Sequence, residues 1–224
     1  MTPFEFYRQL GLLVGLPVAI LAGASALLIV VPRDWRAVLF GYATLSVMLS
    51  LLLSRVMPGE WALLQSIVGG LVAVMIYLSA GQLRNISRSQ VRWPARWPVM
   101  ASLTSFRLIA ALLAALAYYF LHDRVTLPEV TPLYRDTIVW LVMMGILGLA
   151  LHTEPMHAGL SLLTLIGGFE LLMFTLQQDR LLVGLIMGGQ LLLGLAIAYL
   201  ILSHGLAPTV GAALSSTDQT DSFL

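Results

Sequence analysis

The chain has 224 residues, of which 59% are hydrophobic and only 10% are charged, and its formal net charge is +1. A soluble domain carries about 25% charged residues, so much of this apolar surface must face lipid rather than water. The near balance of arginines and acids does not indicate nucleic-acid binding, and the absence of cysteine excludes disulfides, thiolate catalysis and cysteine-held iron–sulfur or zinc sites.

Seven apolar segments are long enough to be considered as membrane spans, since a spanning helix needs about 20 mostly apolar residues. In chain order they are residues 10–31, 37–54, 61–80, 100–121, 134–151, 156–176 and 181–203. The first is expected to be a spanning helix rather than a cleaved signal, because its apolar run is too long and Glu5 precedes it. Most connections are short and polar, so neighbouring helices should run antiparallel. The sequence therefore predicts an all-α, polytopic transmembrane helical bundle of about seven spans.

Two longer connections divide these spans into groups. Residues 82–99 follow the third span, and residues 122–133, with Pro128 and Pro132, follow the fourth. We therefore expect a four-helix transmembrane module at 1–125 and a three-helix module at 126–206. Residues 207–224 are rich in small and polar residues, which is typical of a flexible tail.

The arginines indicate an orientation, because cytoplasmic loops carry an excess of basic residues. Six arginines lie at one end of the predicted bundle and five at the other, and the densest cluster is in the 82–99 connection. We expect a multi-pass protein of a bacterial inner (plasma) membrane, and the arginine distribution predicts that its N-terminus lies outside and its C-terminus in the cytoplasm.

The 82–99 connection contains arginines at every fourth residue with two tryptophans beside them. These residues are Arg84, Arg88, Arg92, Arg96, Trp93 and Trp97. Guanidinium and indole groups are both suited to the headgroup region of a membrane. The pattern fits a docking patch for an acidic partner or anionic lipid, and it also fits an ordinary basic loop.

Glu170 is the only acid well inside a predicted span. A charge at membrane depth costs about 2.5–3.5 kcal/mol on insertion scales, so such a residue is a functional candidate. It is equally consistent with a protonated side chain that holds two helices together. Gln65 and Gln190 also lie inside spans, where their amides would join helices by hydrogen bonds.

Glycines at Gly69, Gly70, Gly184 and Gly188 are predicted to let helices approach closely. The four histidines lie at predicted membrane interfaces without a spacing that indicates a metal site. The chain has no phosphate-binding loop, nucleophile elbow or zinc-binding helix. We expect no catalytic residue, no cofactor and no metal.

Two stretches carry a resemblance to a known superfamily. Residues 140–204 contain a span ending in Gly148-Leu149, a short polar turn, Gly159-Leu160, and a last span with Gly194-Leu195-Ala196. This order resembles the K-type membrane subunit of respiratory complex I, of cation/proton antiporters and of membrane-bound hydrogenases. Residues 60–84, which are rich in glycine, resemble the third span of the J-type partner. The chain thus looks like fused J-like and K-like modules.

The resemblance implies that three positions should carry proton-exchanging acids, and none does. Ser161 stands at the first glutamate of the K-type pattern, Gln190 at the second, and Gln65 near an acid of the J-type pattern. Glu170 lies nine residues beyond Ser161, which places it on the opposite face of a helix and about 13 Å further along. Ser161, Gln65, Gln190, Glu170 and Tyr77 remain the candidates for a proton or ion path.

The leading hypothesis is an accessory, non-catalytic membrane subunit of a complex I-like or antiporter-like ion-translocating assembly. Its partners would be larger antiporter-like subunits and the lipid bilayer, with no nucleic acid. Whether the chain takes part in a proton- or cation-translocating oxidoreductase is left open. A stand-alone secondary transporter and a membrane assembly factor or scaffold are the alternatives.

Overall fold

A computed structural model describes residues 15–32, 34–87, 104–122, 124, 130–177 and 179–221, and this part of the chain forms seven α-helices without strands. The helices are α2 (Gly15–Val30), α3 (Trp35–Leu53), α4 (Gly59–Ser87), α5 (Thr104–Leu121), α6 (Pro132–Leu151), α7 (Pro155–Leu176) and α8 (Arg180–Asp221). Six of them are long and apolar enough to cross a membrane, and α2 is a shorter apolar helix. The predicted helical membrane bundle is confirmed.

Local sequence signals explain several helix ends. The Asp34 side chain caps α3 by accepting a hydrogen bond of 3.3 Å from the backbone N–H of Arg36. Both α6 and α7 begin with a proline, which suits a first turn whose N–H groups have no partner inside the helix.

Two helices run further than the sequence predicts. Helix α4 continues to Ser87, past the expected end of the third span at residue 80. Helix α8 continues to Asp221, through the segment 207–221 for which we expected a flexible tail. This continuation includes Pro208 and Gly211, which disfavour a helix, and it is not explained by the local helix propensity.

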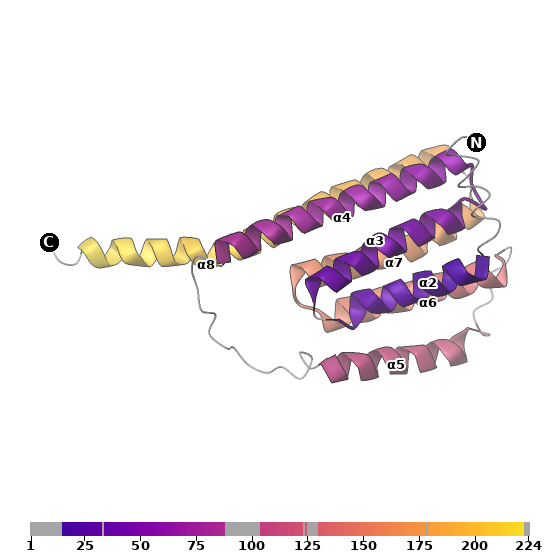
Figure 1. Ribbon diagram of the computed structural model, residues 1–224, viewed down its shortest axis with the longest axis horizontal. Helices are drawn as coiled ribbons and strands as arrows, with labels where there is room; N and C mark the ends of the chain where they lie inside the picture. Colours follow the sequence, from indigo (N-terminus) through magenta and orange to yellow (C-terminus); the bar gives the residue numbers. More distant parts are fainter. Residues whose placement is uncertain are drawn as a thin grey trace.

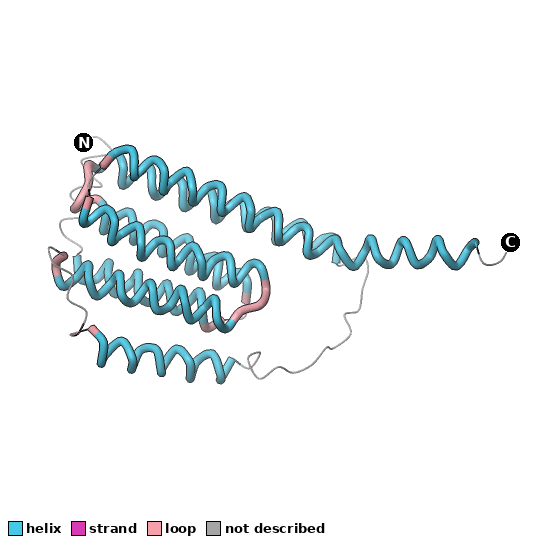
Figure 2. Tube along the Cα trace, turned by 180° about the vertical axis from the view of Figure 1, so that it is seen from behind, coloured by secondary structure: helices cyan, strands magenta, loops and turns pink. Residues whose placement is uncertain are grey.

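The helices form two layers. Helices α2, α3 and α4 lie side by side in one layer, and α6, α7 and α8 form the other (Figure 1; Figure 2). Across the layers α2 contacts α6, α3 contacts α7 and α4 contacts α8, while α5 packs on α6 at the edge of the array. The expected modules 1–125 and 126–206 therefore share one interface through most of their helices.

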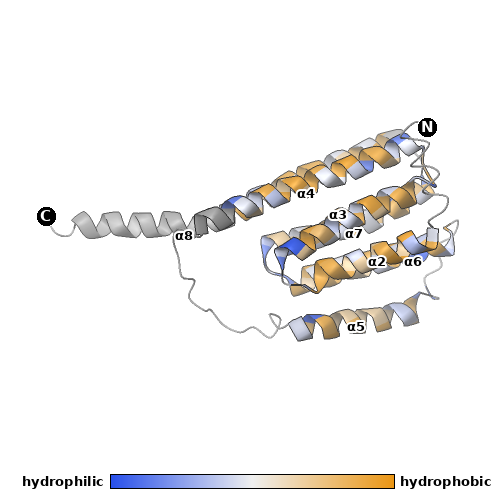
Figure 3. Ribbon diagram, viewed as in Figure 1, coloured by the Kyte–Doolittle hydropathy of each residue, from blue (hydrophilic) through white to orange (hydrophobic). Residues whose placement is uncertain are grey.

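Apolar side chains fill the bundle and also cover its outside. Leu45, Leu141, Leu160 and Phe174 are fully buried between helices. The outer sides of α5 and α8 remain apolar as well, with Leu181 83% exposed (Figure 3). Such a surface suits lipid, because exposing this much apolar area to water would be unfavourable.

Candidate functional site

Three polar side chains from three helices meet inside the bundle. Glu170 of α7 is fully buried, and Gln65 of α4 and Gln190 of α8 are 3% and 5% exposed. The layers place them together because α8 contacts both α4 and α7. Of the candidates drawn from the sequence, these three form one cluster, which we call the Glu170 cluster.

The hydrogen bonds of the Glu170 cluster converge on one carboxylate oxygen. The amide Nε2 of Gln190 donates to Oε2 of Glu170 at 2.6 Å, and Nε2 of Gln65 donates to the same oxygen at 2.8 Å. Nε2 of Gln65 also donates to Oε1 of Gln190 at 3.0 Å. Amide donors stabilise a carboxylate, and they replace water that the apolar surroundings exclude.

Two buried oxygens of the cluster accept no hydrogen bond from the residues that the structure describes. They are Oε1 of Glu170 and Oε1 of Gln65. A buried acceptor without a donor costs about 1–3 kcal/mol, and most native polar groups avoid it. One proton on the carboxyl would convert Oε1 of Glu170 from an acceptor into a donor, so the cluster has the chemistry to hold a single proton.

The Glu170 cluster lies toward one end of the bundle. Glu170 is six residues before the end of α7, which corresponds to about 9 Å along the helix axis. Gln65 is likewise six residues after the start of α4. On the α3 side, the buried Tyr42 lies within electrostatic range of Glu170. Tyr42 was not among the sequence candidates, because an aromatic residue within an apolar span does not stand out.

Ser161 and Tyr77 lie outside the cluster. Ser161 is buried and donates a hydrogen bond of 2.8 Å to the backbone oxygen of His157, and its hydroxyl lies against Gly148 of α6. Glu170 instead faces α4 and α8, as the helical spacing from Ser161 predicts. Tyr77 is 56% exposed, and its ring lies 5.7 Å from that of Trp35 between centroids, with the two planes tilted by 31°.

The predicted packing glycines differ in their surroundings. A Cβ on Gly69 would collide with Ser46 of α3, so this glycine permits a close helix contact. Within the part of the chain that the structure describes, nothing lies within 4 Å of a Cβ built on Gly70, Gly184 or Gly188. These three glycines face away from the bundle. They therefore do not bring its helices together.

The glycines that do allow close contacts between helices include several that the motif spacing does not single out. Cβ atoms would meet neighbouring helices at Gly41, Gly145, Gly148, Gly159, Gly167 and Gly194. The arginine and tryptophan patch is not described: the side chain of Arg84 and residues Arg88, Arg92, Trp93, Arg96 and Trp97 lie outside the described part of the chain.

A histidine pair joins the ends of α6 and α7, where the sequence indicated only interface positions. The rings of His152 and His157 are buried and stacked, with centroids 4.9 Å apart and planes 9° from parallel. Nδ1 of His152 contacts the backbone oxygen of Gly148 at 2.9 Å, and Nδ1 of His157 lies 3.1 Å from a carboxylate oxygen of Glu154. Burial lowers the pKa of His152 from its ordinary value of 6.5, which keeps this imidazole neutral at pH 7.

Neither site resembles a metal centre in its ligand set. Among the described residues, no group of three or more histidine, aspartate or glutamate side chains is arranged to hold a metal ion. The chain matches no known protein family, no curated protein and no solved structure.

Proposed function

We propose that this protein is an accessory integral membrane subunit of an ion-translocating assembly of the complex I-like and antiporter-like kind. In this proposal Glu170 is its proton-exchanging residue. The chain itself carries no redox cofactor and binds beside larger antiporter-like subunits in a bacterial inner membrane.

The observation that carries the proposal is the incomplete hydrogen bonding of a fully buried carboxyl. A carboxyl that served only to hold helices together would be expected to use both of its oxygens. Oε2 of Glu170 accepts two hydrogen bonds, whereas among the described residues neither Oε1 of Glu170 nor Oε1 of Gln65 has a partner. This arrangement supports a group that gains and loses a proton.

The positions of the two glutamines add support. By resemblance, Gln190 stands where K-type subunits have a glutamate, and Gln65 stands near an acid of the J-type pattern. Both donate to Glu170. The cluster therefore has one titratable group among positions at which the resemblance implies several, and a neutral amide at each of the others can stabilise it without competing for the proton.

The depth of the cluster argues against the stand-alone transporter. Secondary transporters bind substrate near the bilayer midplane between repeats, often at broken helices. Glu170 lies about 9 Å from one end of α7, and α7 is continuous from Pro155 to Leu176. A site near one surface fits a subunit that passes protons to or from a neighbouring protein.

The first experiment asks for partners. A tag on the chain, gentle solubilisation of the native membrane and mass spectrometry of the purified material should recover antiporter-like subunits in stoichiometric amounts. Recovery of the chain alone, under conditions that keep other membrane complexes intact, would contradict the subunit proposal and favour the transporter. Partners that bind only during assembly would favour the scaffold.

The second experiment tests Glu170 in the recovered assembly. Glu170→Gln should abolish proton or cation movement into inverted membrane vesicles while the assembly remains intact on native gels. Glu60→Gln is the matched control, because Glu60 is exposed at the start of α4. Unchanged translocation by the Glu170→Gln assembly would leave Glu170 with a structural role only.

A further inference from the structure

Helix α5 is attached to the bundle by few side chains. Only Arg107 and Ala111 are buried among the residues of α5, and the helix packs mainly on α6 with a small contact to α2. The face that α5 turns to the bundle contains Ala111 and Ala115, which are too small to fill the space between the helices.

An apolar cavity of about 590 Å³ occupies this space between α2, α5 and α6. Its lining includes Leu27 and Leu28 of α2, Leu108 and Leu112 of α5, and Trp140 of α6. The lining residues within the described part of the chain are all apolar or aromatic. A void of this size inside a membrane would forfeit packing that an apolar occupant restores.

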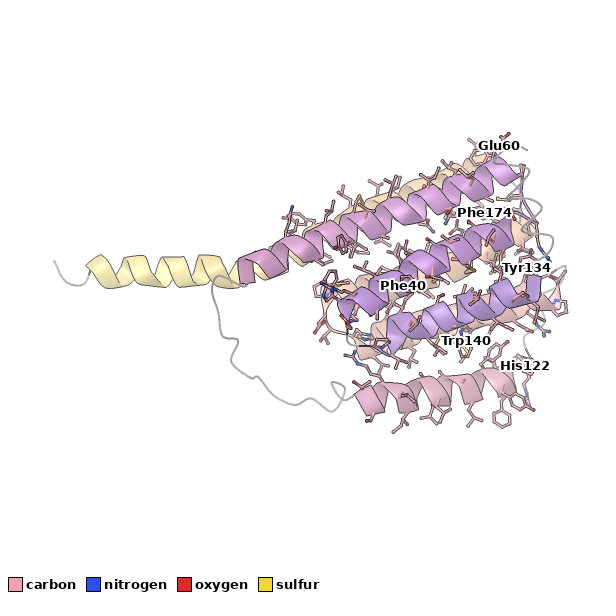
Figure 4. The ribbon with its side chains drawn as sticks, viewed as in Figure 1. Phe40, Glu60, His122, Tyr134, Trp140 and Phe174 are labelled. Carbon is pink, nitrogen blue, oxygen red and sulfur yellow. The ribbon has the colours of Figure 1, made fainter. Side chains whose placement is uncertain are left out.

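The cavity runs from one end of the bundle toward its interior. At its outer end are Val31 and Pro32, where α2 ends, and at its inner end is Trp140, which lies on the side of α6 that faces α5 (Figure 4). The indole N–H of Trp140 donates to the backbone oxygen of Gly23 at 3.1 Å, and its ring meets the edge of Tyr118 at 5.2 Å.

The lining extends along the helices. Seven residues separate Ala24 from Val31 and Leu108 from Ala115, so the cavity extends about 10 Å along the helices.

A basic side chain stands at the outer end. Arg107 directly precedes the lining residue Leu108 and lies one turn before Ala111, and both Arg107 and Ala111 are buried on the face that α5 turns to the bundle. It is the only basic residue of α5. The charged groups at this end of the bundle include Asp34, Arg36 and Glu154, and His152 is within electrostatic range of Arg107.

We propose that this cavity is a binding site for one anionic phospholipid, with its acyl chains between α2, α5 and α6 and its phosphate on Arg107. The lipid supplies the apolar contacts that the alanines of α5 lack and so fixes α5 to the bundle. Arginine suits this task because its planar fork of N–H donors matches phosphate oxygens.

Trp140 provides the probe. The four other tryptophans are replaced by phenylalanine, and the full-length chain is placed in dioleoylphosphatidylcholine vesicles that contain increasing amounts of brominated phosphatidylglycerol or brominated phosphatidylcholine. Bromine atoms quench tryptophan fluorescence on contact. We expect half-maximal quenching at an about fivefold lower mole fraction of phosphatidylglycerol, since one basic residue near the surface is worth about 1 kcal/mol toward an anionic lipid.

Two variants with matched controls separate the headgroup from the chains. Arg107→Gln should remove the preference for phosphatidylglycerol, whereas Arg124→Gln, which is exposed beyond the far end of α5, should keep it. Ala115→Leu, which fills the cavity, should weaken quenching by both lipids, whereas Ala117→Leu on the exposed side of α5 should not.

Equal quenching by the two lipids, or a preference that survives Arg107→Gln, would overturn the proposal. So would the absence of quenching by either lipid in the native assembly, because a partner protein would then fill the cavity. If the single-tryptophan chain does not fold, native mass spectrometry of the otherwise unchanged chain decides. Retention of one phosphatidylglycerol, lost in Arg107→Gln, supports the site, and retention of none contradicts it.

Discussion

Nε2 of Gln190 lies 2.6 Å from Oε2 of Glu170, so the shortest hydrogen bond of the buried cluster crosses from α8 to α7. Gln65 of α4 reaches the same oxygen. One carboxyl group thereby connects three helices, and these contacts can be tested separately from any proton movement.

Replacing Gln65 or Gln190 should destabilise the bundle, and the loss from one substitution should depend on whether the other glutamine is present. Gln190→Leu and Gln65→Leu should each cost about 1 kcal/mol, the usual scale of an interhelical hydrogen bond in a membrane. The double variant should cost less than the sum, because the two amides also bond to each other. Reversible unfolding in mixed detergent gives these free energies.

Gln82→Leu is the control for that cycle, because Gln82 is exposed on α4 and should leave stability nearly unchanged. Strict additivity of the two buried substitutions would contradict the shared hydrogen-bond network.

Adding a single methyl group should distinguish a packed glycine from an open one. A Cβ on Gly145 would lie 2.7–2.8 Å from the Cβ, Cα and backbone nitrogen of Leu165 in α7. Backbone atoms cannot move aside cheaply, so Gly145→Ala should lower stability by about 1–3 kcal/mol. Gly188→Ala meets nothing within 4 Å in the described structure and should be neutral or slightly stabilising. Melting temperatures of the two variants, measured in the same detergent, compare them, and equal losses would show that α6 and α7 are not in this close contact.

The histidine pair predicts a loss of stability in mild acid. Burial lowers the pKa of His152 in the folded protein, with smaller opposing and reinforcing effects from Gly148, His157, Arg107 and Glu154. The unfolded chain therefore binds more protons, so stability is fully present above about pH 6.5 and declines as the pH falls below it.

The measurement for this prediction is the melting temperature between pH 8 and pH 5. The wild type should lose more stability over this range than His152→Gln, which cannot take up the proton. His122→Gln should follow the wild-type curve, since the His122 ring lies outside the stacked pair. Parallel curves for the wild type and His152→Gln would rule out this source of acid sensitivity.

A tyrosine hydroxyl should contribute to the contact between α6 and the end of α3. Tyr134 is buried, and its hydroxyl donates to the backbone oxygen of Leu52 at 3.0 Å. Tyr134→Phe leaves the ring in place and removes only this bond, so we expect a loss of about 1 kcal/mol in the free energy of unfolding. Tyr119→Phe changes an exposed ring of α5 and should have no measurable effect. Equal stabilities of both variants and the wild type would mean that the bond contributes nothing net.

Much of the fold could be predicted because lipid imposes simple length and composition rules. Each of the last six predicted spans coincides with a helix to within a few residues at most ends, and the polar linkers mark most of the turns. The order of the helices in two layers could not be predicted, because every span is apolar on all sides and no amphipathic pattern indicates which neighbour it faces. The same difficulty explains why Gly145 was missed while Gly184 and Gly188 were expected to pack.

The residues of the Glu170 cluster could be predicted from the sequence, whereas their geometry could not. Glu170, Gln65 and Gln190 stood out because polar groups are costly at membrane depth. Their meeting at one oxygen depends on the contacts of α8 with α4 and α7, which no local pattern shows. Ser161 was a candidate through its place in a motif, and its hydroxyl instead bonds to its own helix. Tyr77 points outward.

The position of Glu170 along α7 has an electrical consequence. Helix α7 is about 33 Å long and Glu170 lies about 9 Å from its C-terminal end, so about a quarter of the membrane potential falls between that surface and the carboxyl. The membrane potential would change the free energy of proton binding by only about 0.6 kcal/mol per 100 mV for a proton that arrives from the near side. For a proton that arrives from the far side the change would be about 1.7 kcal/mol per 100 mV. In the proposed proton-exchanging role, the voltage dependence of Glu170 protonation would therefore reveal from which side of the membrane the proton arrives.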